Sequence, residues 1–133
     1  MKASVYHLQI NVRDAAASLP FYRDLLTYFE YRVVMGGADL LRMSNGTTDF
    51  WIMATPAERA AASAHRKNPG LNHVALRVGV RADVDRFHDE FLRPRAIPVL
   101  YGGPRDYPQY RPGYYATFFE DPDRLKLEVA YVP

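Results

Sequence analysis

Alternation of apolar and polar residues predicts a strand at the start of the chain, over residues 5–12. One face of this strand carries Tyr6, Leu8, Ile10 and Val12, and the other carries Val5, His7, Gln9 and Asn11. Asp14 is a suitable N-cap for a helix that continues to about residue 28. In that helix Phe21, Leu25 and Phe29 have helical spacing, and Pro20 requires either a late start or a bend.

The next part of the chain predicts three further strands and a second helix. The strands are expected at 31–34, 38–43 and 49–53, with Gly36-Gly37 and Asn45-Gly46 as the turns between them. The sequence Thr55-Pro56-Ala57-Glu58 resembles a capping box and predicts an alanine-rich helix to about residue 64. Residues 65–70 are polar, end in a turn pair, and form the predicted linker.

The same order of elements then starts again. A strand is predicted at 72–78, a helix at 83–92, and further strands at 97–100, 114–119 and 125–131. His73 follows His7 by 66 residues, and Phe87 follows Phe21 by the same 66. This common register predicts an internal repeat within one domain, 1–133, with one module at about 1–64 and another at about 71–133.

Composition and charge exclude several classes of protein. There are no cysteines, so disulfides, thiolate metal sites and cysteine nucleophiles are excluded. The formal net charge is only +2, and the basic residues are scattered, so no nucleic-acid partner is expected. No apolar run approaches the roughly 20 residues needed to cross a bilayer, and the N-terminus lacks a signal-peptide core, so a cytoplasmic protein is expected.

Three residues suggest metal chemistry. His7 and His73 lie early in the first strand of each module, on the face opposite the aliphatic one, and Glu128 lies on the non-aliphatic face of the last strand. Two imidazoles and a carboxylate suit a divalent metal ion with open positions, if those faces converge. Each residue taken alone is more simply a polar residue on a strand, and only the repeat-related set favours a metal.

The whole chain resembles the superfamily of glyoxalase I, bleomycin-resistance proteins, extradiol dioxygenases and fosfomycin-resistance enzymes, called vicinal oxygen chelate proteins. The residues that carry the resemblance are 7–12 (HLQINV), 21–26 (FYRDLL), 70–78 (GLNHVALRV) and 118–128 (FFEDPDRLKLE). The resemblance implies an α+β fold in which two repeated βαβββ modules form a curved, cupped mixed sheet with flanking helices. It also implies that His7, His73 and Glu128 are the metal ligands.

Two departures from the family pattern affect this expectation. Aligning the Asn45-Gly46 turn with the Asp121-Pro122 turn puts Ile52 opposite Glu128, so the fourth ligand of glyoxalase I is missing. The three-ligand pattern resembles that of dioxygenases and fosfomycin-resistance enzymes. Arg124 replaces the usual glycine of the DPDG turn, which predicts a changed turn geometry.

Other polar and aromatic residues are candidates for contacts with a substrate. Arg77 shares the face of His73 and suits a carboxylate or phosphonate, and a loop tyrosine, Tyr115, is a candidate proton donor. Five of the ten tyrosines lie between residues 97 and 115, where they form either an aromatic pocket or a packed loop. The candidate substrate-binding residues are Gln9, Asn11, Trp51, Tyr101 and Tyr110.

Two functions follow from this reading. The first is a metal-dependent enzyme, a dioxygenase, lyase, isomerase or thiol transferase, that acts on a small oxygenated molecule chelating one Fe, Mn, Ni or Zn ion. The second is a metal-free, drug-sequestering protein of the bleomycin-resistance type, which the tyrosines and Trp51 would fit. Small members of the superfamily usually form homodimers, so the site closes either within one chain or between two.

Overall fold

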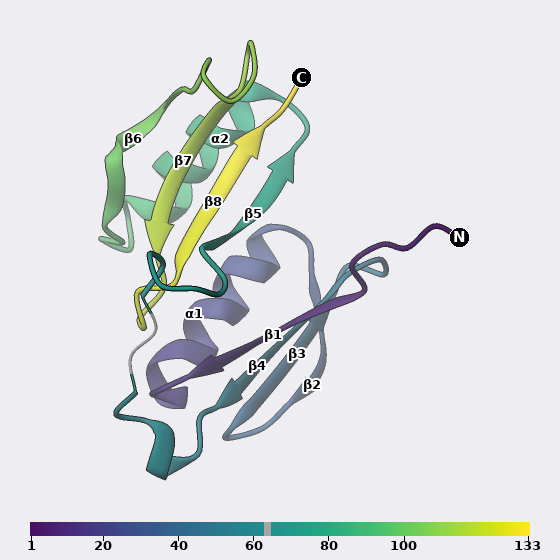
Figure 1. The fold of residues 1–133 in the computed structure, drawn as a ribbon, viewed down its shortest axis with the longest axis vertical. Helices are drawn as coiled ribbons and strands as arrows, with labels where there is room; N and C mark the ends of the chain where they lie inside the picture. Colours follow the sequence, from purple (N-terminus) through teal and green to yellow (C-terminus); the bar gives the residue numbers. More distant parts are fainter. Residues whose placement is uncertain (63–64) are drawn as a thin grey trace. The chain divides into compact units, whose positions relative to one another are not determined.

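The computed structural model describes residues 1–62 and 65–133. They form two compact units, Met1–Ser63 and Ala64–Pro133, and each contains a four-stranded mixed sheet with helical segments. Figure 1 shows the order of elements along the chain. The α+β fold of two βαβββ modules is confirmed. No helix among the described residues is both long enough and apolar enough to span a membrane.

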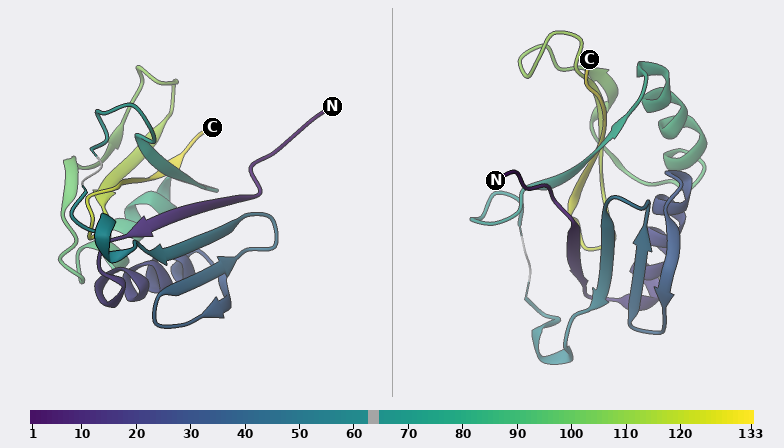
Figure 2. Two further views of the ribbon diagram at one scale, coloured as in Figure 1. Left: turned by 60° about the horizontal axis from the view of Figure 1, so that its bottom comes forward. Right: turned by 90° about the vertical axis from the view of Figure 1, so that its right-hand side faces the viewer.

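The first sheet has the strand order β1-β4-β3-β2. Its strands are β1(His7–Val12), β2(Arg32–Gly36), β3(Leu40–Ser44) and β4(Asp49–Ala54). β1 runs parallel to β4, and the other pairs are antiparallel. α1(Ala15–Tyr28) lies along one face of this sheet, as the two views of Figure 2 show. The first strand begins two residues later than expected. Val5 and Tyr6 are exposed, and the main-chain oxygen of Tyr6 accepts a single hydrogen bond from the N–H of Asp49 in β4, at 2.9 Å.

The cap of α1 follows the sequence, whereas its buried stripe is shifted. Asp14 accepts hydrogen bonds from the main-chain N–H groups of Ala16 and Ala17 at 2.9 and 3.3 Å, which satisfies donors that the first turn leaves unpaired. Pro20 lies inside the helix, which nevertheless starts at Ala15. Tyr22, not Phe21, is fully buried. The wider buried stripe consists of Ser18, Leu19, Tyr22, Leu25 and Leu26.

The second sheet has the order β5-β8-β7-β6, which repeats the topology of the first. Its strands are β5(His73–Val78), β6(Val99–Asp106), β7(Tyr115–Glu120) and β8(Lys126–Tyr131). α2(Arg81–Phe87) continues directly into the π-helical turn η2(His88–Leu92). Phe87 stacks on Phe91 and contacts Phe119, with ring centres 5.2 and 5.4 Å apart, so the helix and the sheet share an aromatic core.

The repeat is visible in the helix positions that are buried. Leu25 and Phe91 are 66 residues apart in the sequence, and both are buried. The same is true of Leu26 and Leu92. The two modules therefore use the same helical face against their sheets.

Two expected elements differ from the structure. The predicted helix to residue 64 is wrong among the described residues: only η1(Ala57–Arg59), a single 3-10 turn, forms, and residues 63 and 64 lie outside the described part. All three η1 residues are exposed, so helical propensity had no apolar face to bury. The strand predicted at 97–100 continues to Asp106 as β6, because a bulge between Leu100 and Arg105 lets it pair with β7 again.

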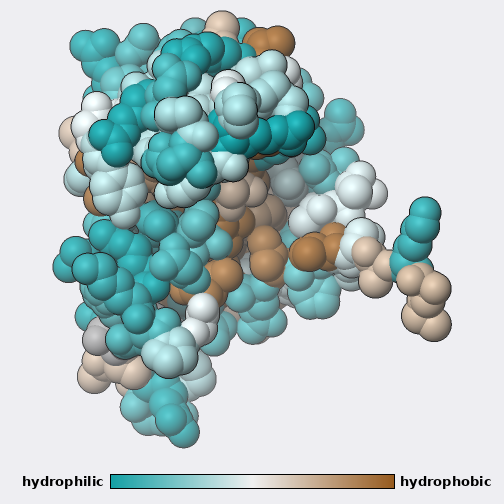
Figure 3. All heavy atoms as spheres, turned by 45° about the horizontal axis from the view of Figure 1, so that its top comes forward, coloured by the Kyte–Doolittle hydropathy of each residue, from teal (hydrophilic) through white to brown (hydrophobic). Residues whose placement is uncertain are grey.

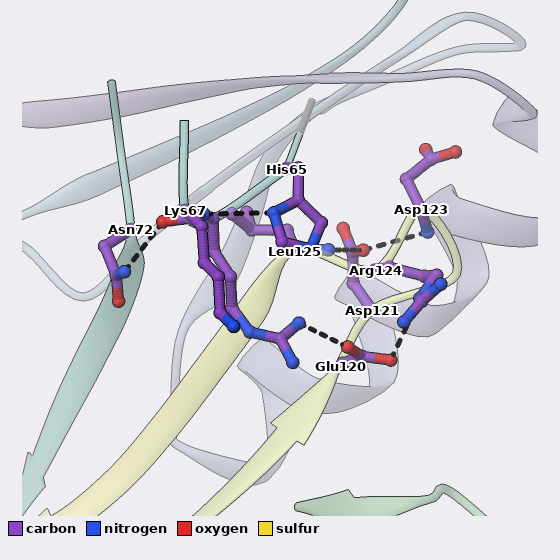
Figure 4. Close-up of polar contacts among 9 residues, drawn as sticks. His65, Lys67, Asn72, Glu120, Asp121, Asp123, Arg124 and Leu125 are labelled. Carbon is purple, nitrogen blue, oxygen red and sulfur yellow. Dashed lines mark hydrogen bonds and ion pairs between the residues drawn. The ribbon is translucent and has the colours of Figure 1, made fainter. Parts of the chain in front are cut away.

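The turn before β8 keeps the geometry expected of a glycine. Arg124 has a φ of +67°, so the predicted change of turn geometry is wrong. Asp121 holds the turn by accepting hydrogen bonds from the N–H groups of Asp123 and Leu125 at 2.9 and 2.8 Å (Figure 4). The side chain of Arg124 reaches Glu120 at 3.5 Å.

Both sheets leave apolar side chains exposed outside their cores. In β2, Val33, Val34 and Met35 are exposed, and in β6 Tyr101 is exposed. Figure 3 shows hydrophobic surface in brown beside hydrophilic surface in teal on one face of the molecule.

Candidate functional site

The centre of the candidate site is a histidine–glutamate pair on adjacent parallel strands. β5 and β8 pair with His73 beside Lys126 and Ala75 beside Glu128, so His73 is diagonal to Glu128 on one face of the sheet. His73 Nε2 lies 3.0 Å from Glu128 Oε2. The Glu128 side chain is only 2% exposed, so it is not a solvent-facing residue of an alternating strand. A buried carboxylate requires partners, and His73 can be one of them only when Nε2 carries a proton or when both atoms bind a shared ion.

Tyr114 is the second partner of Glu128. Its hydroxyl donates a hydrogen bond to Glu128 Oε1 at 2.7 Å. Burial, and then the hydrogen bond to Glu128, raise the pKa of the Tyr114 hydroxyl. Tyr114 therefore remains protonated near neutral pH and acts as a donor that fixes the orientation of the carboxylate.

Asn72 determines how the ring of His73 is presented. The Asn72 side-chain N–H donates to the main-chain carbonyl of Arg66 at 2.8 Å, which fixes the orientation of the amide. Its oxygen, Asn72 Oδ1, then lies 2.7 Å from His73 Nδ1, where it can only accept. His73 Nδ1 therefore carries the proton, and Nε2 is the nitrogen turned toward Glu128.

An ion pair connects the segment before β5, which includes Arg66 and Asn72, to Glu120 at the end of β7. Arg66 Nη1 is 2.6 Å from Glu120 Oε1, and both side chains are mostly buried. Asn72 and Glu120 lie in this group of polar contacts in Figure 4. The ion pair therefore anchors the main chain whose carbonyl orients Asn72.

A pocket of about 470 Å³ opens above the histidine–glutamate pair, and all of its walls belong to the second unit. Its walls are mainly aromatic. Tyr107 stacks on Tyr110 with ring centres 5.5 Å apart, and Tyr110 meets Tyr114 edge-on at the same separation. The lining residues are His73, Tyr101, Arg105, Tyr107, Gln109, Tyr110, Tyr114, Phe118, Lys126 and Glu128.

Two candidate residues of the second unit lie away from Glu128. The hydroxyl of Tyr115 donates to Asp85 at 2.6 Å, because successive residues of β7 point to opposite faces and Tyr115 faces α2. Burial, followed by this hydrogen bond, raises the pKa of Tyr115 to about 12. Arg77 is exposed and donates to the main-chain oxygen of Val132 at 2.7 Å.

In the first unit, the candidate residues cluster around a separate pocket. This pocket, of about 490 Å³, is lined by Tyr6, His7, Gln9, Arg42, Trp51 and Met53. Asn11 accepts a hydrogen bond from Gln9 at 3.3 Å. The structure therefore brings His7, Gln9 and Trp51 together, with Asn11 beside them.

The strand register shows which residue occupies the position of Glu128 in the first unit. His7 pairs with Asp49 on β4, and His73 pairs with Lys126 on β8. Two residues further along each last strand are Trp51 and Glu128. The predicted equivalence of Ile52 with Glu128 is therefore wrong by one residue, and Ile52 is buried in the core. Like isoleucine, the indole of Trp51 offers no metal-ligating atom.

Arg42 and Asp49 form an ion pair beside Trp51 that the sequence analysis missed. Two N–H groups of Arg42 donate to Asp49 Oδ2 at 2.8 and 2.6 Å, and the guanidinium lies 5.0 Å from the centre of the Trp51 ring. A hydrogen bond from Ser44 and then those from Arg42 lower the pKa of Asp49. Alternation along β3 could have shown that Arg42 shares a face with Trp51.

The donor chemistry of the second unit fits part of a metal site. With metal–ligand bonds of about 2.1 Å, neighbouring donor atoms on one ion lie about 3 Å apart, as His73 Nε2 and Glu128 Oε2 do. Among residues 1–62 and 65–133, no three histidine or acidic side chains gather closely enough to hold an ion. A complete ligand set therefore needs a donor beyond this pair.

Comparison with known proteins identifies the family. The model of the Glyoxalase/Bleomycin resistance protein/Dioxygenase superfamily matches residues 4–129, and the chain belongs to this superfamily. The chain is 29% identical to the "Uncharacterized protein YqjT" of Bacillus subtilis, over 94% of this chain and 96% of that protein.

Solved structures agree with this assignment. A Bacillus halodurans protein provisionally described as a glyoxalase is 29% identical and superposes with a TM-score of 0.85, over 98% of this chain and 97% of that one. Lactoylglutathione lyase of Agrobacterium tumefaciens is 20% identical with a TM-score of 0.69, over 98% of this chain and 94% of that one, and so shares the fold.

Proposed function

We propose that the protein is a metal-dependent enzyme of the glyoxalase/dioxygenase type. Its substrate is a small oxygenated molecule that binds the metal through neighbouring oxygens. The proposed ligands are His7, His73 and Glu128, and the proposed ion is Fe, Mn, Ni or Zn. A cytoplasmic homodimer is part of the same proposal.

The observation that carries this proposal is the contact of 3.0 Å between His73 Nε2 and the buried Glu128. Burying a carboxylate is costly unless it serves as a partner or a ligand. Here it lies at the base of a pocket large enough for a small molecule. The equivalent position of His7 in the first module supports its choice as the remaining ligand.

Within this proposal, the neighbouring residues have defined tasks. When bound, the ion supplies Lewis acidity that polarises a substrate oxygen. Tyr114 holds Glu128 through its hydroxyl, and Asn72 keeps Nε2 of His73 free of a proton in the neutral ring. Second-shell hydrogen bonds of this kind hold ligands in place for an ion.

Substrate contacts are assigned to residues that line the two pockets. Tyr101 and Tyr110 are proposed for the second unit, and Gln9 and Trp51 for the first, with Asn11 beside them. Tyr115 is dropped as a substrate contact because its hydroxyl donates to Asp85 on the other face of the sheet, whereas Tyr114 lines the pocket and donates its hydroxyl proton to Glu128. Arg77 remains a candidate for a substrate that reaches the C-terminal end of β5.

The test is metal content by elemental mass spectrometry, on tag-free protein purified without chelator or added metal. We expect near-stoichiometric metal in the wild type and its loss in the His73→Ala and Glu128→Gln variants. His88→Ala is the matched control, because His88 also contacts a carboxylate, Asp89 at 3.1 Å, but on the helical side. A wild type that takes up none of the four ions on titration, or variants that keep full occupancy, would contradict the proposal.

The second candidate function is metal-free sequestration of a drug. The aromatic pocket favours it, since stacked tyrosines suit a planar ligand. It predicts that substitution of Tyr101 or Tyr110 weakens ligand binding, whereas His7→Ala, in the first unit, leaves binding to this pocket unchanged. The buried histidine–glutamate pair has no role in that function, so the enzyme is preferred.

A further inference from the structure

The aromatic pocket of the second unit contains two positive charges without carboxylate partners. Among the described residues, neither Lys126 nor Arg105 forms an ion pair. Lys126 Nζ instead lies 5.4 Å from the ring centre of Phe118 and 5.9 Å from that of Tyr101. The guanidinium carbon of Arg105 lies 4.9 Å from the ring centre of Tyr107. Both cations therefore lie against aromatic walls and keep their charge available to a ligand.

Glu128, the acidic residue that lines the pocket, does not neutralise the charges of Lys126 and Arg105. Glu128 is only 2% exposed, and its two oxygens already contact His73 and Tyr114. A ligand in the pocket therefore meets the two cations before it meets the carboxylate. Among charged lining residues, positive charge is in excess.

The walls provide ring surface beside the charges. Tyr101 and Tyr110 are 47% and 62% exposed, although both line the pocket. Tyr101 is supported edge-on by Phe118, and Tyr110 by its stack on Tyr107. Tyrosine rings held in this way offer flat apolar surface at little cost in side-chain entropy.

We infer that this pocket selects an aromatic anion, a molecule with a planar ring and an adjacent carboxylate or similar negative group. The ring packs against Tyr101 and Tyr110, and the negative group pairs with Lys126 or Arg105. The inference names the substrate class of the proposed function and rests on the same pocket, but its test does not require the metal ion. A cationic drug is disfavoured, because it would approach two unneutralised positive charges.

The experiment compares four probes on chelator-treated protein, with NMR titration as the measurement. Benzoate has the ring and the charge, benzamide has only the ring, benzylammonium has the opposite charge, and cyclohexanecarboxylate has the charge without the aromatic ring. We expect benzoate to bind about fivefold more tightly than benzamide or cyclohexanecarboxylate, and benzylammonium to bind most weakly.

Substitutions then assign the charge. Lys126→Met and Arg105→Met should each weaken benzoate binding severalfold and leave benzamide binding unchanged, which also shows that the pocket is folded. Lys67→Met, which removes an exposed lysine of the same unit, is the matched control. The higher affinity for benzoate should decrease as salt increases.

Several outcomes would overturn the inference. One is that benzamide or benzylammonium binds at least as tightly as benzoate, and another is that cyclohexanecarboxylate and benzoate bind equally. The others are that no probe binds, or that both methionine variants bind benzoate as the wild type does. Because the protein is free of metal throughout, these outcomes are independent of the metal-content test. A protein that takes up none of the four ions on titration but still prefers benzoate would refute the proposed enzyme and keep this inference.

Discussion

Tyr114 donates its hydroxyl hydrogen bond to Glu128 at 2.7 Å, and this contact fixes the carboxylate that faces His73. The adjacent tyrosine, Tyr115, donates to Asp85 on the other face of the sheet. Two tyrosines that are adjacent in the sequence, one just before β7 and one at its start, therefore have separable roles. Removing one hydroxyl at a time therefore separates an effect on the histidine–glutamate site from an effect on folding stability.

We predict that Tyr114→Phe weakens metal binding by about tenfold or more, because partners of metal ligands contribute on that scale. Tyr115→Phe is the matched control: it should lower the free energy of unfolding by about 1 kcal/mol and leave metal affinity unchanged. Metal affinity is measured by competition with a chelating dye, and stability by urea unfolding. Equal metal affinities in the two variants would remove Tyr114 from the site.

A second prediction concerns Asn72, whose amide is held by Arg66 and faces His73 Nδ1. Asn72→Leu should release the ring, so that the proton of neutral His73 distributes over both nitrogens and metal affinity falls about tenfold. Asn72→Asp keeps an acceptor for His73 Nδ1 but loses the N–H bond to the Arg66 carbonyl, so it should restore only part of the affinity. Nitrogen chemical shifts of the His73 ring report the tautomer without any metal.

The control for this experiment is Asn68→Leu, the same substitution in an exposed residue of the same segment. It should change neither the tautomer nor the affinity. If Asn72→Leu leaves the His73 tautomer as in the wild type, Asn72 does not position the ring. That result would not affect the ligand assignment, which the metal content of His73→Ala tests separately.

The sequence predicted the sheets well because both modules bury one face of alternating strands. Polar residues at alternate positions along 7–12 and 73–78 identified the face that bears His7 and His73. The 66-residue offset held for two buried helix pairs, Leu25 with Phe91 and Leu26 with Leu92, but not for the predicted pair, because Phe87 is buried and Phe21 is only partly buried. Pattern and propensity agree in these elements, and such agreement makes prediction reliable.

Local signals failed where long-range contacts decide the outcome. The alanine-rich segment after Thr55 had a helical start signal but no apolar stripe to pack, and only one 3-10 turn formed. Where β7 begins, the sequence could not show which of Tyr114 and Tyr115 faces Glu128, because the orientation of the strand at its first residue, Tyr115, decides this. A shift of one residue reverses the two faces of a strand, and this also explains the error between Ile52 and Trp51.

The third prediction concerns acid sensitivity of the first module. Asp49 is buried and paired with Arg42, and hydrogen bonds from Ser44 and Arg42 lower its pKa in the folded state. An unfolded aspartate titrates near pH 3.9. The stabilisation is therefore complete above about pH 4 and is lost as the pH falls through the lower pKa of the folded state.

We therefore expect Asp49→Asn to be less stable than the wild type at neutral pH, with a difference that shrinks as the pH falls below about 4. Urea midpoints measured across this range test it. Asp39→Asn, which changes an exposed aspartate of the same module, should show no such convergence. A difference between Asp49→Asn and wild type that stays constant with pH would show that the charge of Asp49 is not the source of the stabilisation.

The last prediction concerns the turn before β8, where Arg124 adopts a left-handed conformation with φ at +67°. This conformation costs a residue with a Cβ atom about 1 kcal/mol, whereas glycine adopts it freely. The contact of Arg124 with Glu120 compensates little, because the arginine side chain is 74% exposed and Arg66 already holds Glu120 at 2.6 Å. Arg124→Gly should therefore be more stable than Arg124→Ala by about 1 kcal/mol in urea unfolding followed by circular dichroism. The alanine variant loses the same ionic contact but keeps the backbone strain, so the comparison isolates the strain. Equal stabilities would mean that the hydrogen bonds to Asp121, and not the backbone conformation of residue 124, set the stability of this turn.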